Sequence, residues 1–200
     1  AAIDALSLIS KDPEAELLSL ISCPNGRSKH VIWEQYDSMV QLHTIEGPGA
    51  PAAVVEVPQT ERACLLTMEA EPNKCWTDPY MGASETMALS LRGLWVAGAE
   101  VLGMTNCLNF ASPETPEKFY ELEQCIKGLA DTCRDLDCPV VSGNVSLYNE
   151  TASGQIYPTP LVVTAGLLVN RNRRLESGNA QTGDILYGVG DICGSLGASR

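Results

Sequence analysis

The chain has 200 residues, of which 44% are hydrophobic and 19% charged, and 25 acidic residues against 13 basic ones give a formal net charge of −12. This composition supplies a full core and excludes an intrinsically disordered chain. A polynucleotide partner is excluded as well, because such partners need a basic surface that displaces counterions. A small phosphorylated ligand stays compatible, since a divalent cation can bridge protein oxygens to its phosphates.

The cysteines and histidines argue against a metal site of the zinc type. Eight cysteines are spread along the chain without a C-x-x-C pair, and the only histidines are His30 and His43. Structural zinc usually binds closely spaced ligand pairs, so we expect no zinc site. Because several cysteines lie in apolar segments, and neither a leader peptide nor an apolar run of membrane-spanning length is found, we expect a cytoplasmic protein.

The first third of the chain predicts one short helix followed by strands. Asp12 is a suitable N-cap and Pro13 suits the first helical position, while Pro24-Asn25-Gly26 ends the helix. Apolar runs bounded by turn residues then predict three strands, over residues 39–45, 52–57 and 64–68.

Two long helices are predicted in the middle of the chain, with a strand over residues 101–108 between them. Apolar residues at helical spacing indicate the first helix over residues 79–97, and Gly98 is placed to end it. The second helix begins with Thr115 as N-cap and Pro116 at the first position, and its apolar residues continue at steps of three and four to Leu136.

The remaining pattern completes a mixed fold. Residues 139–141 predict a short buried strand that leads into a polar segment, and residues 160–169 predict a long apolar strand. The order β-β-β-α-β-α-β-β indicates an α+β or mixed α/β domain. Polar residues at 171–182 predict a boundary, after which residues 183–188 predict the first strand of a further domain.

One polar segment, residues 140–150, directly follows an apolar run, and ligands of such sheets usually bind at strand ends. Gly143 would let a phosphate approach the backbone, and Asn144 offers an amide oxygen to a hard cation. Ser146 offers a hydroxyl to a phosphate or a sugar. The structural alternative is a tight Gly-Asn turn.

A second polar segment and an aromatic cluster leave similar alternatives open. Asn106 and Asn109 would meet a cation or a nucleotide, or would cap the loop before the next helix. Asp78, next to Trp76 and Tyr80, is either a binding group or the N-cap of the helix that starts at Pro79. Residues 188–194 do not fit the dinucleotide fingerprint, because the third glycine comes one residue late.

Six segments, which follow one another in the same order as in the family, resemble the synthase subunit of the phosphoribosylformylglycinamidine synthase family. More narrowly, they resemble the second half of its small bacterial form. The segments are residues 33–41, 78–82, 105–110, 113–117, 142–150 and 157–160. The string Ser-Gly-Asn-Val-Ser-Leu-Tyr-Asn-Glu at 142–150 is the most specific. The resemblance implies a ligase of purine biosynthesis. In that reaction ATP phosphorylates the formyl amide oxygen of formylglycinamide ribonucleotide, and ammonia derived from glutamine displaces the phosphate to give the amidine.

The resemblance also implies the fold and its domains. The family belongs to the aminoimidazole ribonucleotide synthetase-like superfamily, whose α+β N-terminal-type domain has a mixed β-sheet packed with helices and pairs as a dimer or pseudo-dimer through a β-barrel. We then expect a lead-in at residues 1–29 and an N-terminal-type domain at residues 30–171. Residues 172–200 would hold a linker and the first strand of a truncated C-terminal-type domain. Such a chain is expected to be inactive alone and to self-associate.

Carried over position by position, the resemblance makes Asn106 and Gly143 nucleotide-binding residues, Asn144 a magnesium ligand and Ser146 a substrate contact, with ATP and Mg²⁺ as cofactors. The family often has an aspartate where Asn106 stands, and the amide would weaken cation binding by one charge. No catalytic residue is expected here, because the family's catalytic histidine and phosphate-contacting lysine belong to the first half.

The expected partners are a glutaminase subunit and a small bridging subunit. The sequence is also compatible with two alternatives: a structural pseudo-dimer domain with a degenerate nucleotide site, and another ATP-binding enzyme of the same superfamily.

Overall fold

The computed structural model describes residues 12–174, 181–185 and 187, and the chain divides into two compact units, residues 1–38 and 39–200. The first unit contains α1 (Pro13–Ser22) and α2 (His30–Trp33). The backbone N–H of Ala15 donates to Oδ1 of Asp12 at 3.0 Å, so the predicted helix and its N-cap are confirmed. None of the α1 residues is buried.

The second unit is built on a six-stranded sheet in the order β1-β2-β3-β8-β4-β5. Its strands are β1 (Thr44–Glu46), β2 (Ala53–Glu56), β3 (Ala63–Glu69), β4 (Glu100–Asn109), β5 (Val140–Ser146) and β8 (Thr159–Leu168). Neighbouring strands run antiparallel except β4 and β5, which are parallel. A small hairpin of β6 (Glu150–Thr151) and β7 (Gly154–Gln155) follows β5.

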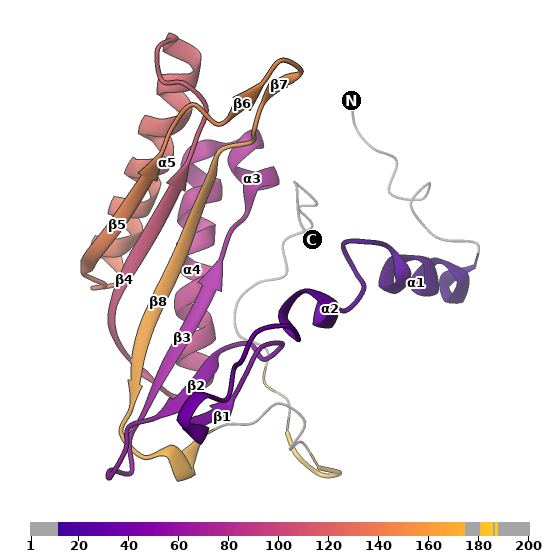
Figure 1. Cartoon of the computed structure of the whole chain (residues 1–200), viewed down its shortest axis with the longest axis vertical. Helices are drawn as coiled ribbons and strands as arrows, with labels where there is room; N and C mark the ends of the chain where they lie inside the picture. The colour runs from indigo at the N-terminus through magenta and orange to yellow at the C-terminus, as the bar shows by residue number, and fades with distance from the viewer. Residues whose placement is uncertain (1–11, 175–180, 186, 188–200) are drawn as a thin grey trace. The chain divides into compact units, whose positions relative to one another are not determined.

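Three helices accompany the sheet: α3 (Pro72–Thr77), α4 (Pro79–Val96) and α5 (Pro116–Asp135). The two long ones, α4 and α5, lie side by side on one face of the sheet (Figure 1). Met87 and Leu91 of α4 and Leu129 of α5 pack there against Met104 and Val162 of the strands. The mixed α+β architecture expected from the sequence is confirmed.

The opposite face of the sheet is not covered by any element of this unit that the structure describes. Along β8, fully buried residues on the helical side alternate with half-buried ones on the other, as in a sheet covered on one face. The open face carries apolar side chains, among them Leu66, Met68 and Leu102, which are 41%, 65% and 52% exposed. The second unit is therefore a two-layer structure with one apolar sheet face left open.

The C-terminus of α4 and the N-terminus of α5 lie where the sequence predicts them. Gly98 has a φ of 82°, and the N–H groups of Gly98 and Ala99 donate to the carbonyls of Trp95 and Leu94, which forms a Schellman motif. Thr115 stands at the N-cap of α5 as expected, but its side chain makes no capping hydrogen bond.

Three sequence predictions are wrong in part. Within residues 39–45, Val40–Leu42 forms a 3₁₀ turn, because Gln41 and Leu42 have φ values of 57° and 60° that no strand contains, so only β1 remains extended. The short α3 has no counterpart among the predicted elements. Among residues 183–188, Gly183–Ile185 and Tyr187 are not in a strand, while Leu186 and Gly188 lie outside the described residues.

The third incorrect prediction concerns the burial of residues 139–141. The strand at 139–141 was expected to be buried, but β5 lies at the edge of the sheet, and Val140 and Val141 are 55% and 69% exposed. An apolar run does not reveal whether a strand has neighbours on both sides. Within the described part of the chain, no helix has the length and apolar character needed to span a membrane.

Candidate functional site

The parallel pair β4 and β5 brings all four sequence-predicted site residues to one edge of the sheet. Its register places Asn106 opposite Gly143, Cys107 opposite Asn144 and Asn109 opposite Ser146. The polar segments thus lie inside the strands rather than after them. Ser146 is the last residue of β5, so it does lie at the strand end, whereas the alternative Gly-Asn turn is wrong, because pairing with β4 keeps the backbone extended.

The four residues divide between the two faces of the sheet, since side chains alternate along a strand. Asn106 lies between the core residues Met104 and Leu108, so Asn106 and the paired Gly143 belong to the helical side. Asn144 and Ser146 belong to the open side. A ligand that contacts all four must therefore lie around the β5 edge, where the backbone has no neighbouring strand among the described residues.

On the helical side, the amide of Asn106 lies directly over Gly143. A Cβ atom built on Gly143 would lie 2.6 Å from Oδ1 of Asn106, closer than real Cβ contacts allow. A side chain at position 143 would therefore have to displace the Asn106 amide. This packing gives Gly143 a structural role that does not depend on a bound phosphate.

On the open side, Asn144 is held by its amide nitrogen. Its Nδ2 donates to Oγ of Ser146 at 3.1 Å and to Sγ of Cys107 at 3.4 Å. This leaves Oδ1 of Asn144 without a donor among the residues that the structure describes. Cys107 was missed by the sequence reasoning, because nothing in the sequence reveals that residues 107 and 144 are paired across two strands.

The exposed amide oxygen of Asn144 would fit as one ligand of a magnesium ion. An amide oxygen is a ligand that hard cations accept, and Asn144 presents one at an exposed edge. In the described part of the chain, no group of three or more His, Cys, Asp or Glu side chains that could hold a metal ion is present. Most ligands of such a cation would therefore be phosphate oxygens, water or groups other than the described His, Cys, Asp and Glu side chains.

The neighbouring polar residues have mainly structural contacts. Asn109 donates through Nδ2 to the carbonyls of Cys107 at 3.0 Å and Thr159 at 3.2 Å, so it fastens the end of β4 and caps no helix. After β5, Asn149 donates to the carbonyls of Ser146 at 2.7 Å and Phe110 at 3.2 Å. These bonds hold the segment after β5 against the end of β4.

The loop after β5 is also held by ionisable groups. Tyr148 donates through its hydroxyl to Oε1 of Glu114 at 3.2 Å, and the negative charge of Glu114, followed by this hydrogen bond, raises the pKa of Tyr148. Glu150 forms a salt bridge with Lys118 at 2.5 Å between Oε2 and Nζ.

Asp78 is the N-cap of α4, which is the structural one of the two roles considered for it. Oδ1 of Asp78 accepts from the N–H of Met81 at 3.0 Å and caps α4. Trp76 stacks on Tyr157, with ring centroids 4.7 Å apart. Tyr80 donates to Asp131 at 3.0 Å and so links α4 to α5.

A mixed sheet with two long helices on one face, and with a parallel, polar pair of strands at one edge, defines a two-layer α+β domain. Residues 49–197 match the family model described as AIR synthase related protein, N-terminal domain. The chain belongs to this family, which confirms the superfamily expected from its motifs.

Curated relatives match nearly the whole chain. The phosphoribosylformylglycinamidine synthase subunit PurL of Moorella thermoacetica is 40% identical over 197 residues, which cover 96% of this chain and 27% of the relative. The chain therefore spans about a quarter of the length of the curated relatives it matches.

Solved structures of Thermotoga maritima proteins share the fold at 30% identity. A structure of PurLQS has a TM-score of 0.70 over 75% of this chain and 25% of that one. PurL complexed with ATP has a TM-score of 0.63 over 71% of this chain and 23% of that one. PurL complexed with FGAR has a TM-score of 0.66 over 75% and 24%.

Proposed function

We propose that the chain is one part of an ATP-dependent ligase of purine biosynthesis that converts formylglycinamide ribonucleotide and glutamine-derived ammonia to the corresponding amidine. The observation that carries this proposal is the 40% identity to a PurL subunit across 96% of the chain. Relatives solved with ATP and with FGAR support the two substrates. The role belongs to the whole enzyme, of which this chain supplies about a quarter.

Within that enzyme, the chain contributes contacts around the β5 edge. Asn106 and the backbone at Gly143 face a nucleotide, Ser146 faces the substrate, and Oδ1 of Asn144 supplies one oxygen to Mg²⁺. These roles are supported by the exposed edge and by Oδ1 of Asn144, which has no donor among the described residues. A bound Mg²⁺ would neutralise phosphate charge during phosphoryl transfer. No residue of the chain is assigned a catalytic role, and the chain alone is inactive.

The open sheet face is the surface for a second domain of the same type. Its apolar residues on β3 and β4 would otherwise face water, which supports burial against a partner surface of like character. In the whole enzyme this partner is the other N-terminal-type domain, and the isolated chain self-associates instead. The PurLQS structure of a relative supports further subunits, which we assign as a glutaminase and a small bridging subunit.

The domain limits proposed for this chain are a lead-in at residues 1–29, the N-terminal-type domain at 30–171 and the beginning of the next domain at 172–200. Limited proteolysis with mass spectrometry tests them. Cleavage is expected near residues 29 and 172. A first cut inside β4 or α5 would contradict the proposed limits.

A chimera tests the proposed function. The matching segment of the Moorella thermoacetica subunit is replaced by this chain, and ADP release is measured with formylglycinamide ribonucleotide, ATP and ammonia. We expect substrate-dependent ADP release by the chimera and none by the chain alone. A folded chimera without activity would contradict the proposed function. Turnover by the chain alone would contradict the proposal that the chain is inactive without the rest of the enzyme.

A second candidate is a structural domain with a degenerate nucleotide site. The packing of Asn106 on Gly143 favours it, because this contact accounts for a glycine at position 143 without a ligand. Calorimetry with Mg²⁺ and ATP on the chimera and on its Asn144→Ala variant separates the candidates. A loss of affinity caused by Asn144→Ala contradicts the structural candidate, and equal affinities support it.

A further inference from the structure

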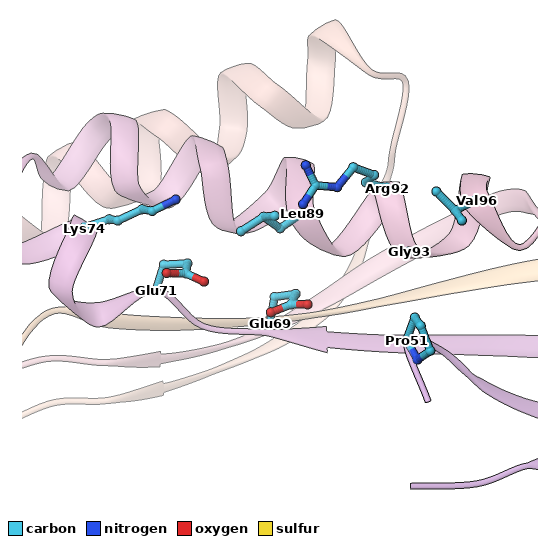
Figure 2. Close-up of a pocket in the computed structure, with 8 residues that line it drawn as sticks. All are labelled: Pro51, Glu69, Glu71, Lys74, Leu89, Arg92, Gly93 and Val96. Atoms are coloured by element: carbon cyan, nitrogen blue, oxygen red, sulfur yellow. The ribbon is translucent and has the colours of Figure 1, made fainter. Parts of the chain in front are cut away.

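A pocket of about 410 Å³ lies on the helical side of the second unit, away from the β4–β5 edge. Its walls come from the end of β3, from α3, from one flank of α4 and from Pro51 (Figure 2). The volume falls in the range of small-molecule sites. None of the four sequence-predicted site residues lines it.

The pocket follows from how α4 approaches β3. A Cβ on Gly93 would lie 2.8 Å from Cγ2 of Thr67, so the glycine lets the helix pack closely on the strand. Beyond Glu69 the chain leaves the sheet and turns into α3. The space between the departing strand and the flank of α4 stays unfilled and forms the pocket.

Opposite charges line opposite walls of this pocket. Glu69 and Glu71 lie on the strand side, and Glu71 is only 5% exposed, whereas Lys74 and Arg92 project from the helices (Figure 2). Lys74 forms a salt bridge with Glu85, at 2.5 Å between Nζ and Oε2. Arg92 forms no ion pair or hydrogen bond with any residue in the described part of the chain, so its guanidinium is available to an anion.

Apolar side chains complete the lining. Leu89 and Val96 belong to the same flank of α4 as Arg92, because residues three and four apart share a helix face. Pro51 lies across from Val96 (Figure 2). The site therefore combines an anionic wall, a guanidinium and an apolar surface.

We propose that this pocket binds a free α-amino acid with an apolar side chain, whose carboxylate is held by Arg92 and whose ammonium lies toward Glu69 and Glu71. A guanidinium binds a carboxylate through two parallel hydrogen bonds. A polyphosphate is disfavoured by the two glutamates, and a simple amine by the two basic side chains. Only a ligand with both charges matches both walls, and its side chain then contacts Leu89 and Val96.

The probe is L-leucine, titrated into the purified chain and followed by ¹H–¹⁵N NMR and by calorimetry. We expect saturable binding with a Kd of about 1 mM or lower and shifts of the Lys74 and Gly93 amide signals. Two analogues that lack one charge each, 4-methylpentanoate and 3-methylbutylamine, are expected to bind at least about tenfold more weakly.

Variants locate the site. Arg92→Gln and Glu69→Gln are each expected to weaken leucine binding about tenfold or more, while Arg173→Gln, an exposed arginine that does not line the pocket, leaves it unchanged. Equal unfolding midpoints confirm that the variants fold. The proposal is overturned if leucine does not saturate, if 4-methylpentanoate binds as tightly as leucine, or if both pocket variants bind like the parent chain.

Discussion

Oδ1 of Asn106 occupies the space that a side chain at position 143 would need, since a Cβ on Gly143 would lie 2.6 Å from it. The two residues are 37 positions apart and meet only because β4 and β5 pair in parallel. A residue whose sequence context suggests a phosphate contact therefore also has a packing reason to be glycine. Any mutation of Gly143 tests both roles at once, so the experiment must separate them.

A double-mutant cycle achieves this separation. Gly143→Ala alone is expected to lower the free energy of unfolding by about 1–2 kcal/mol, because the new methyl group displaces the Asn106 amide. In the background of Asn106→Ala the same substitution is expected to cost less than about 0.5 kcal/mol. Urea denaturation measures all four proteins. Equal costs in both backgrounds would show that the contact does not constrain position 143.

The role of Cys107 in orienting Asn144 is tested by Cys107→Ala in the chimera. Loss of the Sγ acceptor leaves the Asn144 amide held by Ser146 alone, so its orientation is less restricted and the affinity for Mg²⁺ and ATP is expected to fall about threefold to tenfold. The matched control is Cys64→Ala, a half-buried cysteine that pairs with β2 and β8 rather than with β5. An affinity equal to that of the control would contradict the orienting role.

The sequence predicted those parts of the fold that local signals determine. Asp78 and Pro79 begin α4 and Gly98 ends it, because capping and left-handed backbone positions are readable within a few residues. Gln41 and Leu42 show the limit of this approach. Both adopt left-handed backbone without being glycine, and the apolar pattern around them indicated a strand.

The candidate site was less predictable, because it depends on contacts between distant segments. The residue types of Asn144 and Ser146 pointed to oxygen ligands, but not to a position within an edge strand. Which face each side chain occupies depends on the register with β4, and that register also brings in Cys107. A shift of one residue would exchange the faces, and no local signal in the sequence determines it.

Three buried hydroxyl groups connect α4 to the sheet and should contribute to stability. Oγ1 of Thr67 lies 2.6 Å from Oγ1 of Thr164 and 2.8 Å from Oγ of Ser90, which is itself 3.0 Å from Thr164. Thr164→Val keeps the shape but leaves buried hydroxyls with fewer partners. We expect a loss of about 1–3 kcal/mol in the free energy of unfolding.

An exposed threonine serves as the control for this cluster. Thr151→Val removes a hydroxyl whose hydrogen bonds to Ser153 and Gly154 are exposed, so water can replace them and the effect should stay within about 0.5 kcal/mol. Similar losses at positions 164 and 151 would mean that the buried cluster adds no stability of its own.

The C-terminus of α5 offers a stabilising substitution. Asp137 has a φ of 49° and closes a Schellman motif in which the N–H of Cys138 donates to the carbonyl of Cys133 at 2.9 Å. Asp137→Gly removes the strain of the left-handed conformation and is expected to raise the free energy of unfolding by about 0.5–1 kcal/mol. Asp135→Gly, inside the helix, should not stabilise, and a gain there as large as at position 137 would refute the strain argument.

The buried cysteines predict how stability depends on alkaline pH. Burial, with smaller contributions from Cys133 and Asp137, raises the pKa of the Cys138 thiol from 9.0 to about 11. The unfolded chain therefore loses this proton at lower pH than the folded chain. The stability linked to this group is fully present below pH 9 and is lost as the pH rises toward 11, by at most about 1.4 kcal/mol per pH unit.

Cys138→Ala isolates this effect from the other groups that titrate in the same range. The variant is expected to be less stable than the parent at pH 7, because Cys138 packs in the core, but the difference should shrink as the pH rises from 9 to 11. Urea denaturation at several pH values measures both curves. Parallel curves would mean that the thiol titrates alike in the folded and unfolded chains, and that its burial does not oppose ionisation.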